Sequence, residues 1–227
     1  IYSVAYSLAS VITIFQSSVE QVLQPYRFQK LEEKNYKAIF VTTNQILIVF
    51  AVIILLFVVM APEVIRLLFS QDYYEARWTI PAVSASVFFM FIYTCFVNVE
   101  AYFEKTKYVM AASSICAITN IILNYIGIKI YGYIVCGYTT LFSYILFAIL
   151  HYFFLRRVLS EEKINEAPYD IKFILMTSII FLALILGLVA IYDYFYVRII
   201  IFSLIVFIAV INRKRLICLF RNINKKY

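Results

Sequence analysis

Five polar side chains stand inside otherwise apolar segments of the chain and could do chemistry there. They are Gln16, Glu20, Asn98, Asn120 and Asn124. A polar group that faces lipid is unfavourable, so each should contact another helix or line a water-filled cavity. The amides can hydrogen bond to sugar hydroxyls or hold two helices together. These five residues are the candidate cavity-lining site.

Asn120 and Asn124 are four residues apart and share one face of a helix. The small residues Ala112, Ser113 and Cys116 on the same segment would allow a neighbouring helix to approach closely. Packing between helices and lining of a cavity are both compatible with this pattern.

Glu20 lies five residues before Pro25, about 7 Å from the expected helix end at 1.5 Å per residue. Its carboxylate could reach the surface of the surrounding medium, bind a proton or a cation, or pair with a basic residue. Asn98 and Glu100, towards the end of a later segment, pose the same choice.

The first apolar segment carries a polar stripe. Ser3, Ser7, Ser10, Ser17 and Gln21 fall on one face at helical spacing, and three further polar residues lie beside them: Thr13, Gln16 and Glu20. This face should point to other helices or to a cavity.

Enzymatic and metal-binding patterns are weak. Four dispersed cysteines and a single histidine, His151, indicate neither a disulfide framework nor a metal site. The acidic residues that come closest to a catalytic cluster are Glu63, Asp72 and Glu75, and their spacing does not match that of metal ligands. We therefore predict no cofactor, no metal and no enzymatic activity.

Composition places these residues in a membrane. With 64% hydrophobic residues, 15% charged residues and a mean hydropathy of +0.89, the chain has more apolar surface than one soluble core could bury. The fold class should be all-α, because a membrane span must satisfy its own backbone hydrogen bonds. Seven spans are predicted: 1–24, 38–60, 80–102, 108–128, 133–155, 172–192 and 194–211.

Basic residues predict the orientation. Of the 20 Lys and Arg residues, only Arg66, Arg77, Lys129 and Arg198 lie in the second, fourth and sixth joints. The other 16 lie in the odd-numbered joints and the tail, which should be cytoplasmic together with the C-terminus. These cytoplasmic joints and the tail account for much of the net charge of +7, and their basic side chains would contact anionic membrane lipid. No nucleic-acid partner is needed to explain the charge.

Two segments outside the spans are predicted to lie at membrane surfaces. Pro62 suits a helix start, so 61–69 should form a short external interfacial helix, with Trp78 at the same boundary. The tail from Asn212 is either a second interfacial helix or a plain stop-transfer tail. Because Ile1 begins inside an apolar stretch, we expect further sequence upstream.

Three motifs resemble one transporter family. They are the joint Ala61 to Phe69 with Tyr74 and Ala76, the run Asn120 to Asn124 with Gly132, Gly137 and Ser143-Tyr144, and Gln24-Pro25-Tyr26 before a basic joint. Together they resemble the C-terminal half of lipid-linked oligosaccharide (polysaccharide or O-antigen) flippases of the multidrug/oligosaccharidyl-lipid/polysaccharide exporter superfamily.

The resemblance implies one lobe of a two-lobe alternating-access transporter over residues 1–158, followed by a terminal helix pair and basic tail over 159–227. Its partners would be a polyprenyl-pyrophosphate-linked glycan, an N-terminal lobe of the same chain and a candidate polysaccharide polymerase, in the cell membrane. Arg27, Lys37 and Lys107 would meet the pyrophosphate at the cytoplasmic edge. A cation-coupled multidrug exporter of the same superfamily and a membrane-embedded glycosyl or acyl transferase remain the alternatives.

Overall fold

The computed structural model describes residues 2–211, which form seven α-helices, one 3₁₀ helix and no strand. The elements in chain order are α1 (Tyr2–Glu32), α2 (Tyr36–Leu68), η1 (Gln71–Trp78), α3 (Ile80–Tyr102), α4 (Thr106–Tyr131), α5 (Val135–Glu161), α6 (Ile171–Ala190) and α7 (Phe195–Ile211). The predicted tail interface from Asn212 onward lies outside the described residues.

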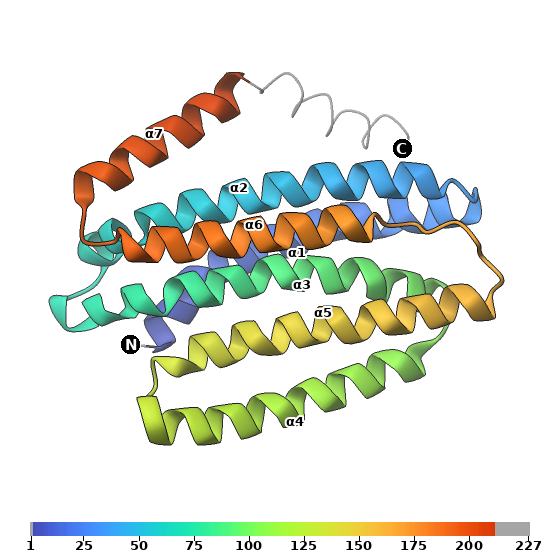
Figure 1. Cartoon of the computed structure of the whole chain (residues 1–227), viewed down its shortest axis with the longest axis horizontal. Helices are drawn as coiled ribbons and strands as arrows, with labels where there is room; N and C mark the ends of the chain where they lie inside the picture. Colours follow the sequence, from blue (N-terminus) through green and yellow to red (C-terminus); the bar gives the residue numbers. More distant parts are fainter. Residues whose placement is uncertain (1, 212–227) are drawn as a thin grey trace.

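The helices form an up-and-down bundle. Figure 1 shows α1 to α6 running lengthwise, with the α1–α2, α3–α4 and α5–α6 connections at one end. The chain start, η1, and the α4–α5 and α6–α7 connections lie at the opposite end. All joints predicted to be rich in Lys and Arg therefore share one end, which we call the basic end.

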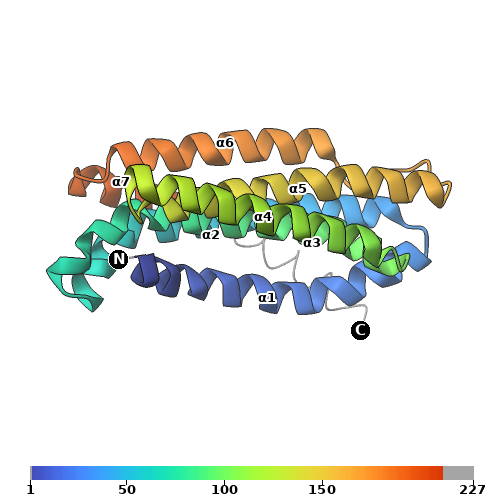
Figure 2. The ribbon, with the colours of Figure 1, turned by 90° about the horizontal axis from the view of Figure 1, so that it is seen from below.

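The centre of the bundle is α3, which contacts α1, α2, α5 and α6. Its Phe88 stacks on Phe181 of α6 at a ring-centroid distance of 4.2 Å, and its Phe91 stacks on Phe50 of α2 at 5.1 Å. In Figure 2 α1 and α6 lie on opposite faces of the bundle. Because apolar residues on every side of α3 are buried, the bundle has a core of its own in addition to its exposed apolar surface.

Five of the helices are long and apolar enough to cross a membrane: α2, α3, α4, α5 and α6. The 17 residues of α7 form a shorter apolar helix, and the polar stripe of α1 keeps it out of this group. The predicted all-α, polytopic membrane bundle is confirmed. Its third span was predicted at the observed bounds, residues 80–102.

Two predicted boundaries were wrong because helices continue through proline. Pro25 lies inside α1, which runs on to Glu32, and Pro62 lies inside α2, which runs on to Leu68. The segment 61–69 is thus not a separate interfacial helix. Ala61 and Ile65 continue the buried face of α2 and pack with Ala76 and Ile80, which stabilises the helix beyond the proline.

Candidate functional site

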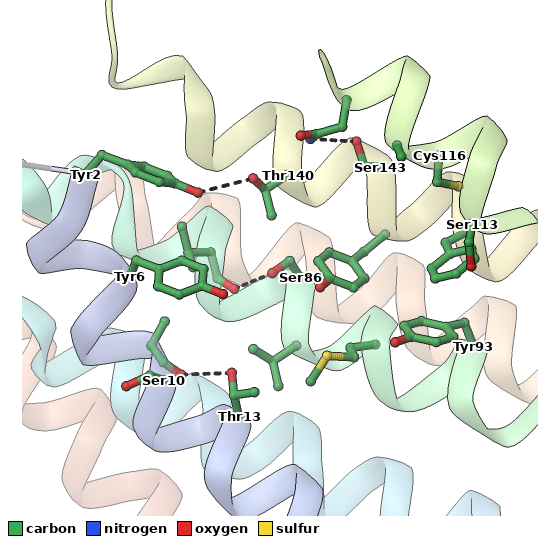
Figure 3. A pocket seen from close by; sticks show the side chains of 18 of the residues that line it. Tyr2, Tyr6, Ser10, Thr13, Ser86, Tyr93, Ser113, Cys116, Thr140 and Ser143 are labelled. Atoms are coloured by element: carbon green, nitrogen blue, oxygen red, sulfur yellow. Dashed lines mark hydrogen bonds between the residues drawn. The ribbon is translucent and has the colours of Figure 1, made fainter. Parts of the chain in front are cut away.

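A cavity of about 510 Å³ opens between α1, α3, α4 and α5 (Figure 3). Hydroxyl and amide groups alternate with apolar side chains along its wall. Its lining comprises Tyr2, Tyr6, Ala9, Ser10, Thr13, Ile14, Val83, Ser86, Val87, Met90, Tyr93, Ser113, Cys116, Ala117, Asn120, Thr140, Ser143, Tyr144 and Phe147. None of these carries a formal charge, so the wall can bind a ligand through neutral hydrogen bonds and aromatic contacts.

Several wall hydroxyls are fixed by their own helices. Ser10 donates to the Ser7 carbonyl at 2.6 Å, Ser86 to the Val83 carbonyl at 2.6 Å, and Thr140 to the Cys136 carbonyl at 2.7 Å. A hydroxyl that donates to the backbone keeps lone pairs that can accept. The wall therefore offers oriented acceptors to a ligand with many O–H or N–H groups.

Asn120 and Asn124 hold α4 against α5. Asn120 Nδ2 donates to Ser143 Oγ at 2.9 Å, and Asn124 Nδ2 donates to Asn120 Oδ1 at 2.9 Å. Thr139 Oγ1 donates in turn to Asn124 Oδ1 at 2.5 Å. Only Asn120 also lines the cavity. Asn124 thus contributes to helix packing, and Asn120 contributes both to helix packing and to the cavity wall.

The polar stripe of α1 divides along its length. Ser10 and Thr13 line the cavity, whereas Ser3, Ser7, Ser17 and Gln21 are exposed on the surface of the bundle. An exposed polar stripe on a membrane helix needs water or a further helix against it.

Glu20 belongs to a buried cluster between α1 and α3. Arg27 Nη1 donates to both carboxylate oxygens of Glu20, at 2.7 and 2.8 Å, and Asn98 Nδ2 donates to Oε2 at 3.2 Å. Arg27 Nη2 also contacts Cys95 Sγ at 3.2 Å. Of the three roles left open for Glu20, the structure shows pairing with a basic residue.

The three proposed headgroup cations are not equivalent. Arg27 is only 2% exposed and is not at the membrane edge, because α1 continues past Pro25 and carries it into the bundle. Lys37 and Lys107 are exposed near the basic end, and Lys107 stands 5.0 Å from the Tyr108 ring. Gln16 is buried on α1, and it is absent from the cavity wall.

A second buried pair was not singled out from the sequence. Glu100 of α3 and His151 of α5 are both fully buried, and His151 Nδ1 lies 2.9 Å from Glu100 Oε1. His151 Nε2 is buried and has no hydrogen-bond partner among residues 2–211. Two features of the sequence could have indicated this pair. One apolar segment contains the chain's only histidine, and another ends close to a glutamate.

Of the three acidic residues near the opposite end, Glu63 is engaged in a contact within the fold. Both carboxylate oxygens of Glu63 accept from the Arg198 guanidinium, which links α2 to α7. Residues 2–211 contain no group of three His, Cys, Asp or Glu side chains arranged to hold a metal ion. Asp72 and Glu75 are exposed on η1.

A family model matches the N-terminal part of this sequence. The MatE model matches residues 1–126, more than half of the 227-residue chain. The chain belongs to the MatE family. No curated protein and no solved structure matches it.

MatE proteins are multi-pass membrane transporters of the multidrug/oligosaccharidyl-lipid/polysaccharide exporter superfamily, and they are not enzymes. The matched region contains α1, α2, η1, α3 and most of α4. Three of the four cavity walls, and the Glu20–Arg27 pair, therefore belong to the MatE part of the chain.

Proposed function

We propose that the full-length protein translocates a polyprenyl-pyrophosphate-linked oligosaccharide across the cell membrane during cell-surface polysaccharide biosynthesis. Alternating access would expose the cavity first to the cytoplasm and then to the outside, without covalent chemistry. The C-terminus and the basic end would be cytoplasmic. The second lobe would come from the N-terminal part of the same chain, and a polysaccharide polymerase would receive the product.

The uncharged, hydroxyl-rich cavity wall carries this proposal. A sugar headgroup leaving water needs neutral hydrogen-bond partners in place of its hydration shell. Ser10, Thr13, Ser86 and Asn120 offer such partners on three helices. The prenyl chain can stay in the bilayer beside the apolar surface of α4.

The competing transporter function is export of cationic drugs. It is favoured by the cavity's aromatic side chains, such as Tyr6, Tyr93 and Phe147, which could bind a cation over their rings. A cation also needs a counter-charge in a cavity of low polarity, and no carboxylate lines this one. Glu20, a carboxylate on the same helix as Ser10 and Thr13, is already paired with Arg27.

The test is complementation of a deletion strain. Loss of the protein should lower surface glycan and raise lipid-linked repeats in the inner leaflet, with no change in sensitivity to cationic drugs. Ser10→Leu should reproduce the defect, because it removes a wall hydroxyl, at unchanged protein abundance. Ser203→Leu, on an exposed position of α7 away from the cavity, is the matched control and should complement fully. Normal glycan export with raised drug sensitivity in the deletion strain would favour the exporter instead.

A further inference from the structure

A second cavity of about 250 Å³ lies between α3, α5 and α6 and is almost wholly apolar. Two of its lining residues carry a hydroxyl, Tyr152 and Ser178, and Ser178 donates to the Ile174 carbonyl of its own helix. The rim residues Ile149, Leu175 and Ile179 are 46%, 57% and 68% exposed. The cavity is therefore a groove that opens on the outer surface of the bundle.

A polar pocket of about 380 Å³ continues the groove at the basic end. The two share Tyr152 and Ile171 as walls, and the polar pocket adds Arg156, Ser160 and Asn165. The space between α5 and α6 is thus apolar in the groove and carries a cationic side chain, Arg156, in the adjoining pocket.

The charge of Arg156 is uncommitted within the described residues. Its side chain is exposed and makes no ion pair there, whereas the neighbouring Arg157 contacts Glu161. Lys105 from the α3–α4 turn contacts two carboxylates on the same side of α5, Glu161 at 3.2 Å and Glu162 at 3.0 Å. Among the residues that line the pocket, Arg156 is the one that carries a charge, and that charge is positive.

We propose that groove and pocket form a binding site for an anionic phospholipid, with one acyl chain in the groove and the phosphate at Arg156. An apolar groove that opens into hydrocarbon gains dispersion contacts when a chain fills it. A guanidinium binds phosphate oxygens through paired N–H donors. Fixed there, the lipid would join α6 to α3 and α5. The site is separate from the cavity and does not depend on what the transporter carries.

Native mass spectrometry of the full-length protein with phosphatidylglycerol or phosphatidylcholine tests the headgroup part. The wild type should retain phosphatidylglycerol in preference. Arg156→Gln should reduce that preference about fivefold, the effect of one basic residue at a membrane surface. Arg157→Gln, one position along and outside the pocket, is the matched control and should leave the preference within about twofold.

A groove-filling variant tests the chain part. Leu175→Trp at the rim should lower retention of phosphatidylglycerol several-fold, whereas Leu186→Trp, also exposed on α6 but outside the groove, should not. Both positions are exposed, so neither change disturbs the core. Equal losses in Arg156→Gln and Arg157→Gln, equal binding of the two phospholipids, or retention of a polyprenyl phosphate in place of phosphatidylglycerol would each overturn the proposal.

Discussion

At the scale of single residues, the Glu20–Arg27 pair illustrates what sequence could and could not predict. The polar position of Glu20 was clear from its apolar surroundings, and pairing was one of three open roles. Arg27 lies seven residues on, two helical turns along the same face, but only if the helix continues through Pro25. Proline normally ends a helix, so the partner was assigned to a joint instead.

Glu20→Gln should destabilise the fold strongly, because it leaves the 2%-exposed Arg27 guanidinium without its counter-charge. Removing one partner of a buried ion pair costs about 3–5 kcal/mol. The thermal unfolding midpoint of the purified protein in detergent measures the loss. Glu20→Gln with Arg27→Met removes both charges and should recover much of it. If Glu20→Gln melts normally but abolishes transport, the carboxylate has a coupling role instead.

Other buried residues also depend on partners that only the fold brings together. Glu100 and His151 are 51 residues apart in sequence, and no local pattern specifies that α3 and α5 place them within 3 Å. The same holds for Arg198, which joins Glu63 across 135 residues. Periodicity identifies the face on which a residue lies, whereas the identity of the opposing helix depends on packing along the whole bundle.

At the scale of elements, the asparagine pair was predicted as a unit with two possible roles. The shared face of Asn120 and Asn124 and the small residues around them correctly indicated a close helix contact. Lining of the cavity by Asn120 could not be inferred from one helix, because the cavity has walls from four.

Asn124→Leu should reduce the stability of the α4–α5 contact. It leaves the Asn120 carbonyl oxygen without this donor, whereas the Thr139 hydroxyl can still donate to the Cys136 carbonyl. An unsatisfied buried polar group costs about 1–3 kcal/mol. We expect a lower amount of folded protein in the membrane, measured by fluorescence size-exclusion chromatography. Normal abundance combined with lost glycan export would show that Asn124 contacts the transported molecule.

The α5 start is held close to α3 by a glycine. A Cβ atom at Gly137 would lie 2.6 Å from Thr79 Cγ2 and 3.1 Å from the Thr79 carbonyl oxygen. Gly137→Ala should therefore reduce the free energy of unfolding by about 1–3 kcal/mol through overpacking. A lower thermal unfolding midpoint would measure this loss. Gly187→Ala in α6, where a Cβ meets nothing within 4 Å, is the matched control. It should be neutral or slightly stabilising, because alanine favours helix; equal effects at both sites would exclude the steric explanation.

At the scale of the whole molecule, hydropathy predicted the number of helices well and their ends less well. The five helices that meet both length and composition criteria were all predicted as spans. The additional turns of α1 and α2 depend on contacts such as Ala61 with η1, which hydropathy does not register. The arrangement around α3 likewise comes from packing and not from the order of the segments.

The exposed stripe of α1 should face water or the second lobe. In a background without native cysteines, Ser17→Cys and Gln21→Cys should react with a small water-soluble maleimide, because both positions are exposed and polar. Phe15→Cys should react slowly, because the native ring packs 5.5 Å from the buried Phe50 ring of α2. Equal protection of all three would show that the stripe is closed by helix packing.

The orientation that we propose for the bundle rests on its distribution of basic residues. The structure places the basic joints at one end, and the positive-inside rule assigns that end to the cytoplasm. Asp72 on η1 and Glu162 after α5 are both exposed and lie at opposite ends. Single cysteines at these positions should therefore label from opposite sides, Asp72→Cys from outside intact cells and Glu162→Cys only after permeabilisation.

Native Cys95 contacts Arg27 in the core, so alanine is the suitable replacement there, with folding checked by the unfolding midpoint. Labelling of Glu162→Cys alone from outside would show that the bundle has the opposite orientation. Labelling of both from outside would contradict the up-and-down arrangement of the helices across the membrane.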